Sequence, residues 1–197
     1  MADDSGFLEL IRRVRTGDEA AAVEVVRRYE RALLREIRLR LRDPRLRRAL
    51  DSGDICQSVL ASFFLRAVSG QYDLQQSDQL HRLLATMARN KLATQARHSY
   101  VARRDHESLR TGLTGGEHLP APDPEPSQAV AASDFCSALL GSLSEDERQL
   151  ADRRARSEEW ADIAAELGGQ PDNLRKKLAR ALNRAARRLG VEPSDGD

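Results

Sequence analysis

The sequence predicts an all-α chain: two small helical domains joined by a flexible linker, the C-terminal domain a helix-turn-helix. Only 4% of its 197 residues are aromatic and 32% are charged, with leucine, alanine and arginine prominent and few alternating β-branched runs, a composition typical of helices. Apolar residues recur at helical spacing on both sides of a proline- and glycine-rich stretch. The formal net charge of +1 excludes a polycation that coats nucleic acid indiscriminately.

The first domain, residues 1–104, is expected to hold four helices. A short helix precedes Gly17-Asp18, and a long one follows as far as Arg42, before Asp43-Pro44. A third helix is expected from about 54 to 68, capped by Ser52 or Asp54, and a fourth from about 78 to 102. The apolar positions expected inside these helices are Phe7, Leu10, Ile11, Val14, Val23, Val26, Leu33, Ile37, Leu41, Ile55, Val59, Phe63, Leu80, Leu83, Leu84, Met87 and Leu92.

Residues 105–133 are expected to be the linker. The stretch contains Thr111-Gly112, Gly115-Gly116 and four prolines between Pro120 and Pro126. From 110 to 134 there are four acids and one base. Such a composition cannot bury enough apolar surface to fold by itself, which predicts an extended connection.

The second domain, residues 134–190, ends in two amphipathic helices joined by a tight turn; residues 191–197 form a tail. In the first of the two, Trp160, Ile163, Ala164 and Leu167 share one face, and Ser157 is the expected N-cap. Gly168-Gly169 should end it, and Gln170-Pro171 should start the next. The face of that helix expected inside is Leu174, Leu178, Ala181, Leu182, Ala185 and Leu189.

The outward face of this last helix is cationic: from 171 to 189 there are seven lysines or arginines against one aspartate. In a helix-turn-helix protein, the second helix enters the major groove and its N-terminal half meets base edges. The alternative is an ordinary solvated face. The residues predicted to contact DNA here are Asp172, Asn173, Arg175, Lys176, Lys177 and Arg180.

The fourth expected helix and its C-terminal extension hold a second cationic group, which includes one aromatic residue. Such a surface could follow a phosphate backbone and stack an unpaired base, although the pattern taken alone is more typical of an ordinary surface helix. The candidate residues are Asn90, Lys91, Arg97, Tyr100, Arg103 and Arg104.

Catalytic and metal chemistry has little support in the sequence. Cys56 and Cys136 are too few and too widely separated for a disulfide or zinc framework, and His81, His98 and His106 lack ligand spacing. His81 is expected on the surface and Cys56 inside. We therefore expect no cofactor, no catalytic residues and no membrane insertion, with a reducing cytoplasm as the compartment.

Taken in their order along the sequence, the two predicted domains resemble the RNA polymerase sigma factors of the extracytoplasmic-function (ECF) type. Asp54-Ile55-Cys56-Gln57 is similar to the family's Asp-x-x-Gln pattern, and 83–90 looks like its Trp-Leu-x-x-Ile-Ala-x-Asn stretch, followed by the basic Arg97. Leu143-Ser144 with Arg148, then 160–164, 167–168 and 173–178, resemble the domain that reads the −35 element.

The resemblance implies a role for each group of residues. Asp54 and Gln57 would dock on core RNA polymerase, the Asn90-to-Arg104 group would recognise and melt the −10 element, and the last helix would read the −35 element. Promoter DNA is the implied second partner and an anti-sigma protein a third. A stand-alone regulator that binds operator DNA is the alternative function.

Several positions depart from the family pattern. Leu83 replaces the usual tryptophan, Thr94 stands where aspartate is common, and Ser157 replaces a glycine. Asn173 occupies a usual threonine position, and Gln170-Pro171 replaces the commoner turn residues. These departures bear on the promoter sequence and its melting rather than on the fold.

Overall fold

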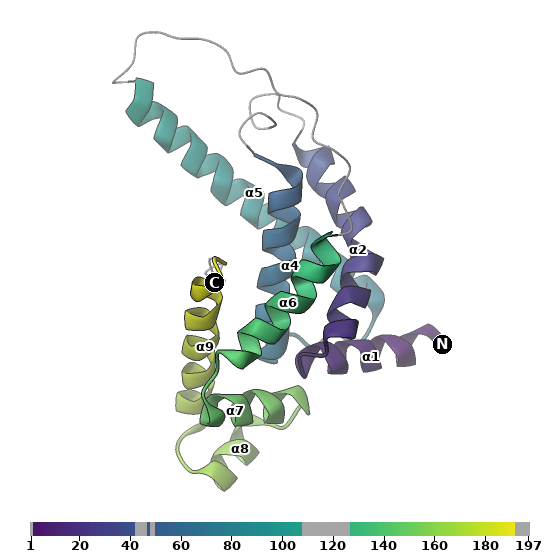
Figure 1. The fold of residues 1–197 in the computed structure, drawn as a ribbon, viewed down its shortest axis with the longest axis vertical. Coiled ribbons are helices and arrows are strands. Elements are labelled where there is room, and N and C mark those ends of the chain that lie inside the picture. Colours follow the sequence, from purple (N-terminus) through teal and green to yellow (C-terminus); the bar gives the residue numbers. More distant parts are fainter. Residues whose placement is uncertain (1, 42–46, 48–49, 108–126, 192–197) are drawn as a thin grey trace.

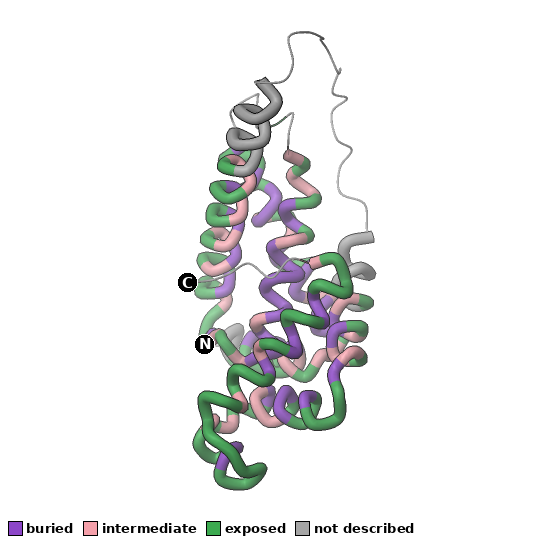
Figure 2. The backbone as a smooth tube through the Cα atoms, turned by 90° about the vertical axis from the view of Figure 1, so that its left-hand side faces the viewer, coloured by how far each residue is buried: buried purple, intermediate pink, exposed green. Residues whose placement is uncertain are grey.

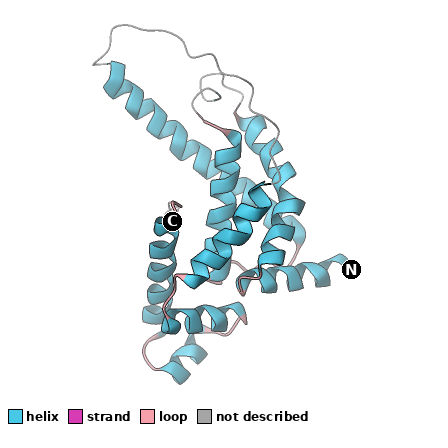
Figure 3. Ribbon diagram, viewed as in Figure 1, coloured by secondary structure: helices cyan, strands magenta, loops and turns pink. Residues whose placement is uncertain are grey.

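The computed structural model describes residues 2–41, 47, 50–107 and 127–191, without the side chains of 2–4, 98–107 and 127–133. Within these ranges the regular structure is entirely helical, which confirms the predicted all-α class (Figures 1 and 3). The helices there are α1 (Ala2–Arg15), α2 (Glu19–Arg40), α4 (Ser52–Val68), α5 (Ser77–Glu107), α6 (Ser127–Gly141), α7 (Glu145–Ala155), α8 (Trp160–Leu167) and α9 (Pro171–Arg188).

The turn between α1 and α2 is built by Gly17 and Asp18. Gly17 has φ of +78°, a left-handed conformation that glycine adopts at little steric cost. Asp18 is the N-cap of α2 and accepts a hydrogen bond from the backbone N–H of Ala21 at 2.9 Å. A 2.8 Å ion pair with Arg13 lowers the pKa of Asp18 below its ordinary value. The predicted helix restart at Gly17-Asp18 is confirmed.

The first hydrophobic core lies among α1, α2, α4 and α5 and also takes Cys136 from α6. Most of the predicted inward positions are buried in it, whereas Val23 is only half-buried and Val25 is fully buried instead. Leu83, at the family's tryptophan position, packs against this core as a partly buried side chain together with Met87. A leucine therefore fills that position without leaving it exposed.

The start of α4 differs from the prediction. Its N-cap is Asp51, whose carboxylate accepts hydrogen bonds from the backbone N–H groups of Gly53 and Asp54. Ser52 and Asp54, the expected caps, lie inside the first turn. An aspartate at this position satisfies two otherwise unpaired N–H groups at once, which explains why the helix begins earlier than predicted.

The second hydrophobic core joins α4 to the C-terminal helices. Leu65 and Val68 of α4 pack with residues of α6, α7, α8 and α9, among them Leu139, Ile163 and Leu178. α4 is consequently buried on almost every side along its C-terminal half (Figure 2). The two cores do not separate at the predicted domain boundary, because α4 and α6 contribute to both.

Polar contacts also connect the two parts of the chain. Arg15 of α1 donates to the backbone carbonyl of Tyr72 at 2.6 Å and to the hydroxyl of Ser157 at 3.0 Å. Burial lowers the pKa of this arginine. Arg154 of α7 donates to the carbonyl of Gly70 at 3.3 Å. These bonds tie the α7–α8 turn to the turn that follows α4.

Helices extend into both ends of the predicted linker, residues 105–133. α5 continues to Glu107 and α6 begins at Ser127. The glycine and proline clusters that motivated the linker prediction fall in 108–126, outside the described residues. α6 packs on α2 and α4, so the start of the predicted second domain lies against the first domain.

Replacing Leu178 with alanine should destabilise the protein, because this side chain is only 1% exposed. Large-to-small substitutions at such positions cost about 2–5 kcal/mol. The matched control is Leu167→Ala, since Leu167 is 38% exposed. Chemical denaturation of both variants measures the difference, and equal losses in the free energy of unfolding would contradict the described orientation of α9.

Candidate nucleic-acid interface

The helix α8 begins later than the sequence suggested. It starts at Trp160, and its N-cap is Glu159, which makes no side-chain capping bond. Ser157, the expected cap, instead has φ of +63°, a conformation that costs little only for glycine. This positive φ is a physical reason for the glycine that the family usually has at this position. Leu167 was expected inside with Trp160 and Ile163, but it is exposed because it is the last residue of the helix.

The turn 168–170 has the backbone that its sequence predicts. Gly168 and Gly169 have φ of +78° and +100°, and α8 ends at Leu167. Pro171 then occupies the first turn of α9, where its fixed φ suits a helix and its missing N–H costs nothing. The turn therefore sets the direction in which α9 leaves α8.

The helix α9 is strongly two-faced. Its buried side consists of Leu178, Ala181, Leu182, Ala185 and Ala186. Leu174 is half-buried and Leu189 is 37% exposed, so the apolar face is shorter at both ends than predicted. The six predicted DNA contacts on this helix are all exposed: Asp172, Asn173, Arg175, Lys176, Lys177 and Arg180.

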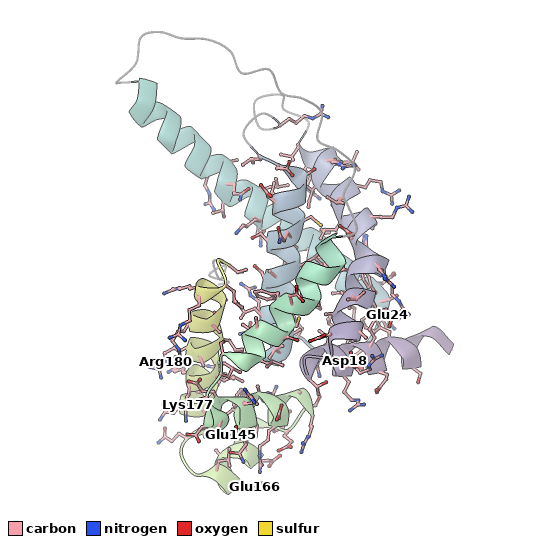
Figure 4. All side chains as sticks on the ribbon, in the orientation of Figure 1. Asp18, Glu24, Glu145, Glu166, Lys177 and Arg180 are labelled. Carbon is pink, nitrogen blue, oxygen red and sulfur yellow. The ribbon has the colours of Figure 1, made fainter. Side chains whose placement is uncertain are left out.

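Weak surface pairs hold some of these exposed cations. Arg175 lies 3.3 Å from Asp172 within α9, and Lys177 lies 3.3 Å from Asp146 of α7. The guanidinium of Arg180 donates to the carbonyl of Lys176 at 3.2 Å. Figure 4 shows Lys177 and Arg180 on the outer side of α9. Exposed pairs of this kind contribute about 0–1 kcal/mol, so an anionic ligand can replace them at little cost.

A more buried pair fixes α9 to α7. The guanidinium of Arg184 donates to both carboxylate oxygens of Glu147, at 2.8 and 3.0 Å. Glu147 also closes a capping box with Ser144 at the start of α7. The hydrogen bond from Arg184 lowers the pKa of Glu147 below its ordinary value, and the bonds with Ser144 add to this. The sequence counted Arg184 only among the seven cations of this helix and did not predict its pair with Glu147. The Ser-x-x-Glu spacing of Ser144 and Glu147, however, is typical of a capping box.

Two neighbouring arginines hold α8 in place. Arg153 pairs with Glu166 at 2.6 Å and with Glu158 at 3.3 Å, and the hydrogen bond to Glu166 raises its pKa. The guanidinium of Arg154 lies 5.1 Å from the ring centroid of Trp160, within cation–π range. These contacts orient α8 and therefore the turn that directs α9.

The second predicted cationic group lies along α5. Asn90 and Arg97 are exposed and Lys91 is half-buried. Arg97 donates to the hydroxyl of Thr94 at 3.2 Å, at the position where the family has an aspartate. Tyr100, Arg103 and Arg104 continue on the same helix, and their side chains lie outside the described residues. The structure therefore places three of these six side chains.

The two predicted polymerase contacts lie at the start of α4. Asp54 and Gln57 are both exposed, while Ile55 and Val59 beside them are buried. The pair borders a cavity of about 480 Å³ whose walls include Phe64, Phe135 of α6 and Val191 after α9. Both side chains are thus available on one face without supporting the core.

The described residues contain no group of three or more potential metal-ligating side chains. Cys56 and Cys136 are buried, and burial raises the pKa of each thiol to about 12, which keeps both protonated near neutral pH. His81 is exposed, as predicted. Within the same ranges, the helices are all too short or too polar to cross a membrane.

An all-helical chain that displays a cationic helix over a buried apolar face has an architecture typical of helical DNA-binding proteins. The family model described as ECF sigma factor matches residues 5–190. The chain therefore belongs to the ECF sigma factors, a DNA-binding family that acts in transcription initiation as a non-catalytic subunit of RNA polymerase. This membership does not favour the stand-alone regulator. No curated protein and no solved structure matches the chain.

Replacing Arg184 with glutamine should remove a pH-dependent part of the stability. The folded-state pKa of Glu147 lies below the ordinary 4.5, so its stabilising effect is present above that value and is lost as pH falls through the folded pKa. The wild type should therefore exceed the variant in unfolding free energy near neutral pH, and the gap should close in acid.

Arg187→Gln is the matched control, because Arg187 is exposed on the same helix and forms no salt bridge within the described residues. Urea unfolding at several pH values measures the gap. A gap that stays constant from neutral to acidic pH would show that Arg184 acts through packing rather than through the carboxylate.

Proposed function

We propose that this chain binds core RNA polymerase in the cytoplasm and directs it to promoters, with residues 134–190 reading the −35 element and residues 1–104 handling the −10 element. The observation that best supports this is the exposed cationic row of α9, held outward by the buried face around Leu178. Because the chain belongs to the ECF family, transcription initiation is the process in which such a row would act.

At the −35 element, the N-terminal half of α9 would meet base edges. Asn173 and Arg175 are exposed there and have the amide and fork geometry that reads adenine and guanine. Arg175 would exchange its exposed contact with Asp172 for a base. The later cations, Arg187 and Arg188, would lie near phosphates.

At the −10 element, α5 would offer polar and cationic side chains to DNA that is being opened. Asn90 and Arg97 are the exposed members of this group. Extruding a base costs a few kcal/mol, and contacts from this helix together with the polymerase would offset that cost. Arg97 would leave its hydrogen bond with Thr94, a neutral partner that competes less with phosphate than an aspartate would.

Polymerase docking would fall to Asp54 and Gln57. They are three residues apart on α4, so they share a face, and both are exposed. Their helix is anchored by buried neighbours on the opposite side, which gives a partner a rigid surface. Rigid presentation reduces the ordering cost of association.

Arg175→Ala should weaken binding to the cognate −35 sequence by about 1–3 kcal/mol and relax the preference at one base position. Arg187, which is also an exposed cation of α9, provides the comparison: Arg187→Ala should weaken binding to all sequences alike and lower its salt dependence. Competition binding on a set of single-base promoter variants measures both effects. A uniform loss for Arg175→Ala would assign this side chain to a phosphate instead.

The double variant Asp54→Ala with Gln57→Ala should lose polymerase association, because removing a hydrogen-bonded charged contact at an interface costs about 2–5 kcal/mol. Helicity should stay normal, since neither side chain is buried. Pull-down of purified core polymerase, followed by transcription from a cognate promoter, measures the loss.

The matched control is Gln149→Ala with Asp152→Ala, which removes the same two residue types at the same spacing from the exposed side of α7. This control should bind polymerase as the wild type does. If the Asp54/Gln57 variant retains wild-type binding, the docking assignment is wrong, whatever the result at α9.

A further inference from the structure

A row of exposed arginines runs along α2, a helix to which the proposed function gives no role. The row consists of Arg27, Arg31, Arg35 and Arg38, and all four are exposed. Their spacing of four, four and three residues keeps them on one face of the helix. At about 1.5 Å per residue, the row extends over roughly 16 Å.

The carboxylates of α2 are engaged elsewhere or partly buried. Glu24 pairs with Arg28, and Glu36 pairs with Arg40 at 2.5 Å. Glu30 is half-buried, and desolvation raises its pKa. Within the described residues, none of the four arginines of the row forms a salt bridge. The row therefore presents positive charge that this part of the chain does not neutralise.

This face lies apart from the cationic surface of α9. Glu24 precedes Arg27 by three residues and so marks the same side of α2. In Figure 4, Glu24 projects on the side of the molecule opposite to Lys177 and Arg180. DNA bound along α9 would have to bend around the molecule to reach the row. The row would therefore bind a separate segment of its ligand.

We propose that the arginine row of α2 binds the phosphodiester backbone of duplex DNA without reading its bases. Guanidinium groups match phosphate oxygens in geometry and remain charged at all relevant pH values. Duplex DNA carries about one negative charge per 1.7 Å of its axis, enough to supply each arginine with a phosphate over the length of the row.

The composition of this face favours a polyanion over a protein. The centre of a stable protein interface is apolar and rich in aromatic residues. Among the exposed large hydrophobic residues of the described chain, Leu39 alone lies on α2. A surface with charge but no apolar centre gains its binding energy mainly through counterion release from nucleic acid.

The salt dependence of DNA binding tests this proposal. The full chain is titrated onto a fluorescent duplex of random sequence between about 50 and 200 mM salt, and log K is plotted against log salt. Arg31→Gln with Arg35→Gln should reduce the slope by about 1.8, at about 0.9 for each lost phosphate contact. Because the duplex carries no promoter, this result is independent of the proposed −35 and −10 roles.

Two controls accompany the variant. Arg82→Gln with Arg156→Gln removes the same charge at exposed positions off α2 and should leave the slope unchanged. Arg31→Lys with Arg35→Lys keeps the charge and should keep the slope. The proposal is overturned by an unchanged slope for the glutamine variant or by an equal loss in the Arg82/Arg156 control. It is also overturned if the substitutions change the binding of single-stranded DNA or of polyglutamate but not the binding of the duplex.

Discussion

The apolar helix α4 must be covered by other helices, and this requirement arranges both halves of the fold. Its middle residues, such as Phe63 and Phe64, lie in the core with α1, α2 and α5, and Leu65 and Val68 lie in the core with α6 to α9. A helix that is apolar all round is stable only when it is covered on all sides. Both predicted domains are therefore arranged around one helix, whose exposed start carries Asp54 and Gln57.

The same packing determines what α9 can present. Leu178, Leu182 and Ala185 are held in the second core, and Arg184 is fixed on Glu147, so the remaining cations of the helix face solvent. Specificity in DNA recognition requires such fixed geometry, because base contacts discriminate only when the side chains are positioned by the scaffold. The buried half of α9 would thus be as important to the proposed reading of DNA as its exposed half.

Local signals in the sequence predicted the helices, the Gly17 and Gly168-Gly169 turns and the buried face around Leu178, because capping and periodicity act over a few residues. The joining of two cores through Leu65 and the pairing of Arg184 with Glu147 were not predicted, since both depend on residues far apart in the chain. Ser157 misled the capping prediction, because a serine resembles an N-cap even when its backbone is left-handed. The roles of the predicted DNA and polymerase contacts remain predictions, since exposure alone does not identify a partner.

We propose that this chain gives core RNA polymerase its promoter specificity, and run-off transcription on a library of genomic fragments is the decisive experiment. Core polymerase supplemented with the chain should yield discrete transcripts whose start sites share two upstream elements at constant spacing. Core polymerase alone should not yield them. Transcripts identical with and without the chain would show that it confers no promoter specificity.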